Sequence, residues 1–251
     1  MDFSSIKNLA LAVLLGTCAL AMAAPAEATE AESEVETITL MGTLRDFSDA
    51  HPDFERNPGE TSDDGTRFRY GIDRNITSDV LGEDNKPVYL DGSFSTTTKE
   101  SFDQWYRDVE GVNQSMRYPI TLIEQDNGIY RYENRSFFPL NNKLFGNEGR
   151  SKNFHFTYEL NTTFTYQGGE VFNFSGDDDV WVYINGSKVI ELGGVHSRAD
   201  ANVSLEEVAE EIGLVIGETY ALDFFFAERH TSQSNLIIET SIEFEQEMFA
   251  D

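Results

Sequence analysis

The sequence predicts an all-β protein, a β-sandwich or β-barrel with about two short helices. Most of residues 37–251 alternates apolar and polar side chains over short runs that end in Gly, Asn or Asp, which is typical of strands joined by tight turns. Only two segments space their apolar residues as a helix does. No internal repeat and no linker-like composition divides this stretch, so we expect it to form one domain.

The composition excludes several classes of partner. The 251 residues include 18 Lys and Arg against 45 Asp and Glu, a formal net charge of −27. Because an acidic surface repels phosphate, we expect no binding to nucleic acid and no docking on anionic lipid. Hydrophobic residues at 39% and aromatic residues at 12% are too frequent for a solvated coil and supply an aromatic core. Cys18 is the one cysteine, so no disulfide forms within the chain.

Residues 1–23 have the features of a secretory signal peptide. Lys7 precedes the apolar residues 9–22, a run too short to span a bilayer, and Ala21-Met22-Ala23 fits the rule of small residues at the cleavage site. Residues 24–36 are acidic and predict a disordered linker. We therefore expect a protein that is secreted, extracellular or at the cell surface, or periplasmic, and that does not insert in a membrane.

Two capping boxes predict the two helices. Thr97 with Glu100 precedes an apolar stripe at helical spacing. Ser204 with Glu207 precedes a second stripe, and Gly213 is the expected stop.

The clearest hairpin lies in the C-terminal half. Residues 180–184 alternate and meet Asn185-Gly186, a pair that accepts the positive φ values of a type I′ turn. Residues 188–192 return, and the two-residue loop places Ile184 opposite Ser187. Counting outward predicts three acidic residues against a leucine and two glycines: Asp179 opposite Leu192, Asp178 opposite Gly193 and Asp177 opposite Gly194.

Two further strands enclose a loop that is rich in potential ligand groups. Tyr220 to Phe226 and Leu236 to Phe244 each place alternate apolar residues on one face. Between them, residues 228–235 read Glu-Arg-His-Thr-Ser-Gln-Ser-Asn.

The acidic triplet is the strongest candidate for a cation site. Neighbouring carboxylates raise one another's pKa unless a cation or hydrogen-bond donors compensate, and Ca²⁺ takes six to eight oxygen ligands. A solvated acidic turn is the alternative in a protein of this charge. Asp63-Asp64 is a similar pair with polar flanks and no hairpin behind it, so we expect only a loop there.

No catalytic motif of a known class is present in the sequence. The spacing of the four histidines does not indicate a zinc enzyme, and no nucleophile elbow, P-loop or dinucleotide-binding fingerprint occurs. His196 and His230 could converge, but we expect hydrogen-bonded structural histidines.

Several motifs together resemble the fibro-slime domain, a branch of the protective-antigen (PA-fourteen) superfamily of β-sandwiches. The resemblance covers about residues 38–245 and implies a twisted antiparallel β-sandwich or jelly roll. It rests on FNFSGDDDVWVYING at 172–186, LGGVH at 192–196, FFAERH at 225–230 and SN at 234–235, with further matches at residues 45–47, 51–55, 105–106, 137–140 and 153–157.

The resemblance implies a calcium site, because lectins of this superfamily bind Ca²⁺ through an Asp-Asp pair and the ion chelates sugar hydroxyls. The matching metal ligands here are Asp177 and Asp178, with Asn235 as third ligand and Gln233 as its alternative. Asp179 stands where the lectins have Gly, and the Glu228-Arg229-His230 cluster has no lectin counterpart. The remaining candidates for ligand binding are Asp179, Gly193, Gly194, His196, Glu228, Arg229, His230 and Gln233.

The predicted function is therefore an exported, Ca²⁺-dependent carbohydrate-binding or adhesion module without catalysis. Its expected partner is a glycan or cell-surface polysaccharide. One alternative is a structural matrix or surface protein with a purely structural calcium site. The other is a polysaccharide hydrolase that uses Asp178 and Glu228.

Overall fold

The structure is a computed structural model that describes residues 35–62, 65–125 and 127–245. The predicted signal peptide (1–23), nearly all of the predicted linker (24–36) and the Asp63-Asp64 pair lie outside the described residues. The described residues form one compact unit. Within the described part, neither helix has the length and apolar character to cross a bilayer.

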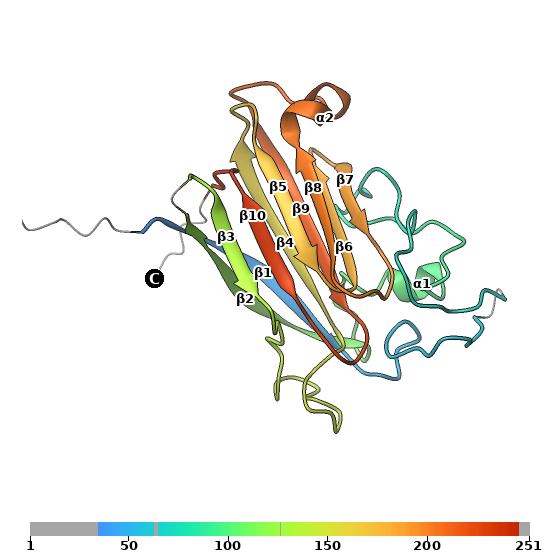
Figure 1. The fold of residues 1–251 in the computed structure, drawn as a ribbon. Coiled ribbons are helices and arrows are strands. Elements are labelled where there is room, and N and C mark those ends of the chain that lie inside the picture. The colour runs from blue at the N-terminus through green and yellow to red at the C-terminus, as the bar shows by residue number, and fades with distance from the viewer. Residues whose placement is uncertain (1–34, 63–64, 126, 246–251) are drawn as a thin grey trace, which may run out of the picture. The chain divides into compact units, whose positions relative to one another are not determined.

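The described residues form ten strands in one antiparallel sheet, with two short helices, which confirms the predicted all-β class (Figure 1). The order of strands in the sheet is β7-β6-β9-β4-β1-β2-β3-β10-β5-β8. The strands are β1 (Thr37–Phe47), β2 (Asn113–Glu124), β3 (Tyr130–Asn134), β4 (Phe156–Thr165), β5 (Val171–Gly176), β6 (Asp179–Ile184), β7 (Ser187–Leu192), β8 (Ala199–Ser204), β9 (Thr219–Glu228) and β10 (Leu236–Thr240).

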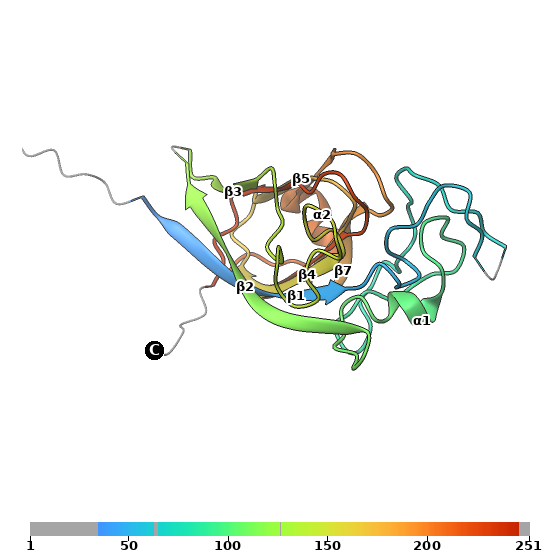
Figure 2. The same cartoon turned by 90° about the horizontal axis from the view of Figure 1, so that it is seen from below.

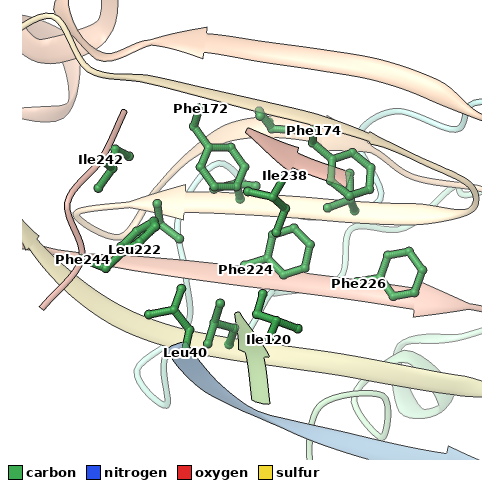
Figure 3. Packing of buried hydrophobic residues seen from close by; sticks show 14 of the residues in the cluster. Leu40, Ile120, Phe172, Phe174, Leu222, Phe224, Phe226, Ile238, Ile242 and Phe244 are labelled. Atoms are coloured by element: carbon green, nitrogen blue, oxygen red, sulfur yellow. The ribbon is translucent and has the colours of Figure 1, made fainter. Parts of the chain in front are cut away.

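The sheet curls around an apolar core, which we call the inner core (Figure 3). Its edge strands β7 and β8 lie near each other, so the sheet is nearly closed. Phe172 and Phe174 of β5 face Phe224 of β9, with ring centroids 6.5 and 5.9 Å apart. Burying a side chain of this size contributes about 1.5–3 kcal/mol. The period-two pattern of the sequence therefore builds this core directly.

A second buried cluster lies on the other face of β6 and β9, and we call it the outer cluster. It is covered by residues 48–112, which connect β1 to β2 and which we call the outer segment; Figures 1 and 2 show this segment and α1 (Lys99–Phe102) gathered on one side of the sheet. Tyr106 meets Phe225 of β9 at 4.9 Å, and Phe102 meets Trp181 of β6 at 5.7 Å between ring centroids. Strand β6 is consequently buried on both faces.

Helix α1 begins one residue later than predicted. Thr98, rather than Thr97, is the N-cap, and its hydroxyl accepts a hydrogen bond from Ser101 N at 3.1 Å while Ser101 Oγ accepts one from Thr98 N at 3.1 Å. Thr97 instead donates its hydroxyl to Asp53. The tertiary contact with Asp53 thus displaces the expected box with Glu100, and the regular helix lasts only four residues.

Helix α2 (Leu205–Ile212) agrees with the prediction except at its start. Gly213 ends it in the left-handed region, at φ 75°, as a C-terminal glycine does. Ser204 is the N-cap residue, but its side chain makes no capping hydrogen bond, so the expected box with Glu207 does not form.

The hairpin forms at Asn185-Gly186, but the predicted register is wrong by one residue beyond Tyr183. Val182 pairs with Ile190, so Val189 is an extra residue on the returning strand, and Val180 rather than Asp179 pairs with Leu192. A β-bulge of this kind shifts every later pair by one. It removes the expected pairings of Asp178 with Gly193 and of Asp177 with Gly194, and brings Asp179 to the glycines.

Candidate ligand-binding site

A hollow of about 280 Å³ lies where three loops meet at one end of the sheet. The loops follow β5, β7 and β9, and the outer segment completes the wall. The lining residues are Tyr70, Asp177, Asp178, Val195, His196, Ser197, His230, Thr231, Ser232 and Gln233.

Asp177 and Asp178 connect strand β5, near one edge of the sheet, to strand β6, near the other edge. Strand β5 pairs with β10 and β8, whereas β6 pairs with β7 and β9. The chain therefore passes through the two aspartates from one group of paired strands to the other. Asp178 adopts φ 52°, a conformation uncommon for a residue with a side chain. Such backbone outliers persist where the surroundings fix them, and they cluster at ligand sites.

The structure brings the three predicted metal ligands together. Asp178 Oδ2 accepts a hydrogen bond from Arg229 N at 2.9 Å, and its Oδ1 accepts one from His196 N at 3.3 Å. Asp177 Oδ2 accepts a hydrogen bond from Asn235 Nδ2. Asp177 Oδ1 is buried without a partner in the described part of the chain.

Glu228 adds a further buried carboxyl group beside the aspartates. It ends β9 with no exposed surface, and neither of its oxygens has a hydrogen-bond partner among the described residues. The hydroxyl of Ser234 lies close to it but not in hydrogen-bond geometry. Burial and the charge of Asp178 raise the pKa of Glu228 well above its usual value. Burial and the charge of Asp179 raise the pKa of Asp178 to about 8.

Asp179 and Arg229 lie beneath the hollow and do not line it. Both are fully buried, and the guanidinium contacts the carboxylate with two nitrogens, at 2.5 and 3.0 Å. Arg229 Nη1 also donates to Ser95 O at 2.6 Å, and the guanidinium lies 4.7 Å from the ring centroid of Trp105. The Asp that replaces the lectin Gly thus binds an arginine that ties β9 to the outer segment.

Gly193 and Gly194 allow two segments of the chain to approach each other closely. A Cβ on Gly194 would lie 2.4 Å from Gly71 O, and one on Gly193 would lie 2.6 Å from Asp73 O. Neither contact is compatible with a side chain. These glycines therefore let the outer segment dock against the loop after β7, and they do not line the hollow.

The two histidines of this region converge on the hollow and are hydrogen-bonded. His230 Nε2 lies 2.9 Å from Tyr70 Oη, and His196 Nδ1 lies 2.9 Å from Ser197 O. Gln233, the alternative metal ligand, lines the hollow without contacting the aspartates by hydrogen bond in the described structure.

Tyr70 is the site residue that sequence reasoning missed. It lies in an irregular loop more than 100 positions before the acidic triplet, where nothing in the spacing distinguishes it from other aromatic residues. The pairing of residues 71–73 with the loop after β7 brings it to the hollow, and that pairing has no local signal.

The carboxylates alone do not form a ready metal site. Within the described ranges, no three His, Cys, Asp or Glu side chains are grouped around one point as metal ligands. An ion held here would need amide, backbone or ligand oxygens as well, a mixture that Ca²⁺ accepts.

The comparisons with known proteins agree with the predicted family. Residues 141–247 match the family model described as the PA14 domain. Protein psiC of Dictyostelium discoideum is 36% identical over 225 residues, covering 82% of this chain and 41% of psiC. Protein psiD of the same organism is 36% identical over 229 residues, covering 85% of this chain and 43% of psiD. The chain thus spans about two fifths of these relatives.

Solved structures of PA14 domains are similar at low sequence identity. The PA14 sugar-binding domain from an RTX adhesin is 11% identical, with a TM-score of 0.36, over 83% of this chain and 93% of that one. The PA14 domain of the MpAFP antifreeze protein is 13% identical, with a TM-score of 0.29, over 45% of this chain and 65% of that one. The residues that match the PA14 family model include Asp177, Asp178 and Asn235, so this part of the chain resembles a PA14 domain.

Proposed function

We propose that the protein is a Ca²⁺-dependent carbohydrate-binding or adhesion module that acts outside the cell. The observation that carries the proposal is a buried carboxyl oxygen of the lining, Asp177 Oδ1, that has no partner among the described residues; both oxygens of Glu228, which is buried behind the lining, are unpaired as well. A buried carboxylate without a compensating partner is destabilising by several kcal/mol. A bound cation beside these oxygens would compensate them.

The residues present fit calcium better than a softer metal. All candidate donors are oxygens, from Asp177, Asp178 and the Asn235 side chain, with Gln233 as the alternative amide. The Asn235 amide donates to Asp177 in the structure, and rotation of this amide by half a turn would present its oxygen instead. Mg²⁺ should substitute poorly, because it requires tighter octahedral geometry and releases its waters reluctantly. When bound, Ca²⁺ would supply coordination sites for vicinal hydroxyl groups.

The surroundings of the aspartates favour a polyhydroxylated ligand. PA14 domains are a carbohydrate-binding and adhesion type of fold. The hollow is lined by short polar side chains and by an amide, among them Ser197, Thr231 and Gln233, which can donate and accept hydrogen bonds. Few groups there are charged apart from the aspartates, so a neutral glycan is the best match.

A hydrolase that uses Asp178 and Glu228 has less support. Glu228 is fully buried and does not line the hollow, and both oxygens of Asp178 accept backbone hydrogen bonds. A general acid or base has to reach the proton that it transfers, directly or through one water. Glu228 is not placed for that task, so the pair lacks one of its two members at the hollow.

The test is melting temperature against Ca²⁺ concentration for the parent, Asp178→Asn and a matched control. If Ca²⁺ binds only the folded state, about 100-fold excess over Kd should add roughly 2.7 kcal/mol of stability. Asp178→Asn should lose most of this gain, while Asp91→Asn, on an exposed turn, should keep it. Equal behaviour of both variants, or no shift in the parent, would contradict a calcium site at the aspartates.

A glycan array with Ca²⁺ and with EDTA then separates the two calcium-binding functions. Glycan binding that EDTA abolishes supports the carbohydrate-binding module. A calcium-dependent shift in melting temperature without any glycan bound supports the structural matrix protein instead. Export is tested separately, by mass spectrometry of the secreted chain: cleavage is expected after Ala23 or within the next few residues, and an intact Met1 would contradict it.

A further inference from the structure

One wall of the hollow comes from outside the matched PA14 residues. Tyr70, on the outer segment, lines the hollow with 48% of its surface exposed. Its hydroxyl group lies 2.9 Å from Nε2 of His230, in the loop after β9. The centroids of the two rings are 5.2 Å apart, and the ring planes are inclined by 79°. Tyr70 is the one aromatic residue other than the histidines in the described lining.

The backbone next to Tyr70 is fixed against the loop after β7. Gly71 N donates to Val195 O at 2.8 Å, and Asp73 N donates to Gly193 O at 2.6 Å. The carboxylate of Asp73 is itself held by the backbone and hydroxyl groups of residues 93–95, at 2.7–3.1 Å. The wall is therefore in place before a ligand binds, and a rigid site avoids the entropy of ordering it on binding.

The lining of the hollow combines two kinds of group that suit a sugar ring. Asp177 and Asp178 supply acidic groups, where hydroxyl groups would be held, and Tyr70 supplies an aromatic surface in the same lining. Burial and the charges of Glu55 and Asp178 raise the pKa of Tyr70, which agrees with their proximity. A pyranose carries hydroxyl groups at its edge and an apolar C–H face, and binding pockets commonly pair aromatic surface with a few placed polar groups.

We propose that Tyr70 is a ligand-contacting residue, whose ring packs on the C–H face of a pyranose while the sugar hydroxyls meet the aspartate side. The outer segment would then select a cyclic sugar over other compounds with vicinal hydroxyls. This inference rests on the proposed function.

The test measures binding in saturating Ca²⁺ to methyl pyranosides of glucose, galactose, mannose and fucose, with mannitol as an acyclic polyol. Tyr70→Ala should weaken binding of the best pyranoside about tenfold or more and leave mannitol binding unchanged. Tyr70→Phe keeps the ring and loses the hydrogen bond to His230, so its affinity should stay within about threefold. Phe145→Ala, which truncates another exposed aromatic residue, is the control and should bind as the parent does.

Each failure has its own signature. If Tyr70→Ala binds the pyranoside as the parent does, the ring makes no contribution and the inference is overturned. Loss of mannitol binding, or of the Ca²⁺-induced rise in melting temperature, to the same extent would also overturn it, because Tyr70 would then act through the fold of the cation site. If no pyranoside binds the parent in Ca²⁺, the proposed function fails and this inference fails with it.

Discussion

The inner core and the outer cluster share strands β6 and β9 but are built from different chemistry. Alternate residues of β9, Leu222, Phe224 and Phe226, enter the inner core, whose members are aliphatic and aromatic side chains without charge. Their neighbours Phe225 and Ala227 enter the outer cluster. There the aromatic side chains surround buried charges, which belong to Asp53, Asp73, Asp179 and Arg229.

The difference shows two ways of holding a chain in place. The inner core is stabilised by removal of apolar surface from water, which depends little on the exact partner. The outer segment has little regular structure of its own, and several of its backbone groups are satisfied by buried carboxylates. Asp53, for example, accepts hydrogen bonds from Thr97 N at 2.6 Å and from Trp105 Nε1 at 3.0 Å. The polar contacts fix the geometry of the hollow, and losing one partner leaves another unpaired.

The largest effect is expected from removing the buried arginine. Arg229→Met leaves Asp179 buried without its partner, which should lower the free energy of unfolding by about 3–5 kcal/mol. The measurement is urea denaturation of the parent and the variant. Arg135→Met, which removes the exposed pairing with Glu133, should cost about 0–1 kcal/mol.

A double variant tests whether the unpaired charge is the cause. Asp179→Leu combined with Arg229→Met removes both charges, and a buried pair can be replaced by apolar residues at little cost. The double variant should therefore be more stable than Arg229→Met alone. If it is less stable, the pair acts mainly through its contacts to Ser95 and Trp105.

The second effect should be local to the outer segment. Asp73→Ala removes the acceptor of hydrogen bonds from Ser93 Oγ at 2.7 Å and Phe94 N at 2.9 Å, and the buried donors left behind should cost about 2–3 kcal/mol. Limited proteolysis should cut residues 48–112 first. Asp91→Ala is the matched control on an exposed turn. Protection of this segment equal to that of the parent would contradict the role given to Asp73.

The same contrast decides what could be predicted from sequence. Period-two alternation in β9 and β10, the Asn-Gly turn and Gly213 are local signals, and the structure agrees with each of them. The one-residue register error came from a bulge at Val189, which no local pattern revealed. The capping box at Thr97 failed for a related reason, because Asp53 binds its hydroxyl from far away in the chain.

The residues of the candidate site also divide into those with a local sequence signal and those placed by long-range contacts. Asp177 and Asn235 are brought into contact at the ends of the adjacent strands β5 and β10, so the motifs that name them lie together in space; their role as metal ligands stays a prediction. The burial of Arg229 and the presence of Tyr70 depend on how the outer segment packs. That packing rests on polar contacts between residues more than 100 positions apart, which leave no periodic trace in a sequence.

A smaller, pH-dependent effect is expected at Glu55, which connects the outer segment to the loop after β9. Its carboxylate lies 2.9 Å from His155 Nε2 and accepts hydrogen bonds from Thr231 N at 3.1 Å and Thr231 Oγ1 at 2.7 Å. Burial raises the pKa of Glu55, but these hydrogen bonds lower it by more, to about 2. Because the folded-state pKa is depressed, the stabilisation is complete above the ordinary pKa of 4.5 and is lost as the pH falls towards 2.

The comparison that isolates this group is Glu55→Gln against the parent over a range of pH. The difference in unfolding free energy should be about 1–2 kcal/mol above pH 5, after allowance for partial solvent exposure, and should shrink as the pH falls towards 2. Other carboxyl groups titrate in both proteins and cancel in the difference. A difference that does not change with pH would show that the charge of Glu55 plays no part.

The smallest effect should come from the inner core. Ile238→Val removes one methylene from a side chain that is 2% exposed and pairs through β10 with Phe174 of β5, which should cost about 0.5–1.5 kcal/mol in urea denaturation. Because the inner core and the outer cluster lie on opposite faces of β9, this variant should leave proteolysis of residues 48–112 and the Ca²⁺-induced stabilisation unchanged. Its cost should add to that of Asp73→Ala within about 0.5 kcal/mol. A clearly larger combined loss, or early cleavage of the outer segment in Ile238→Val alone, would mean that the two clusters unfold as one cooperative unit, and the apolar packing inside the sheet would then control the wall of the hollow as well.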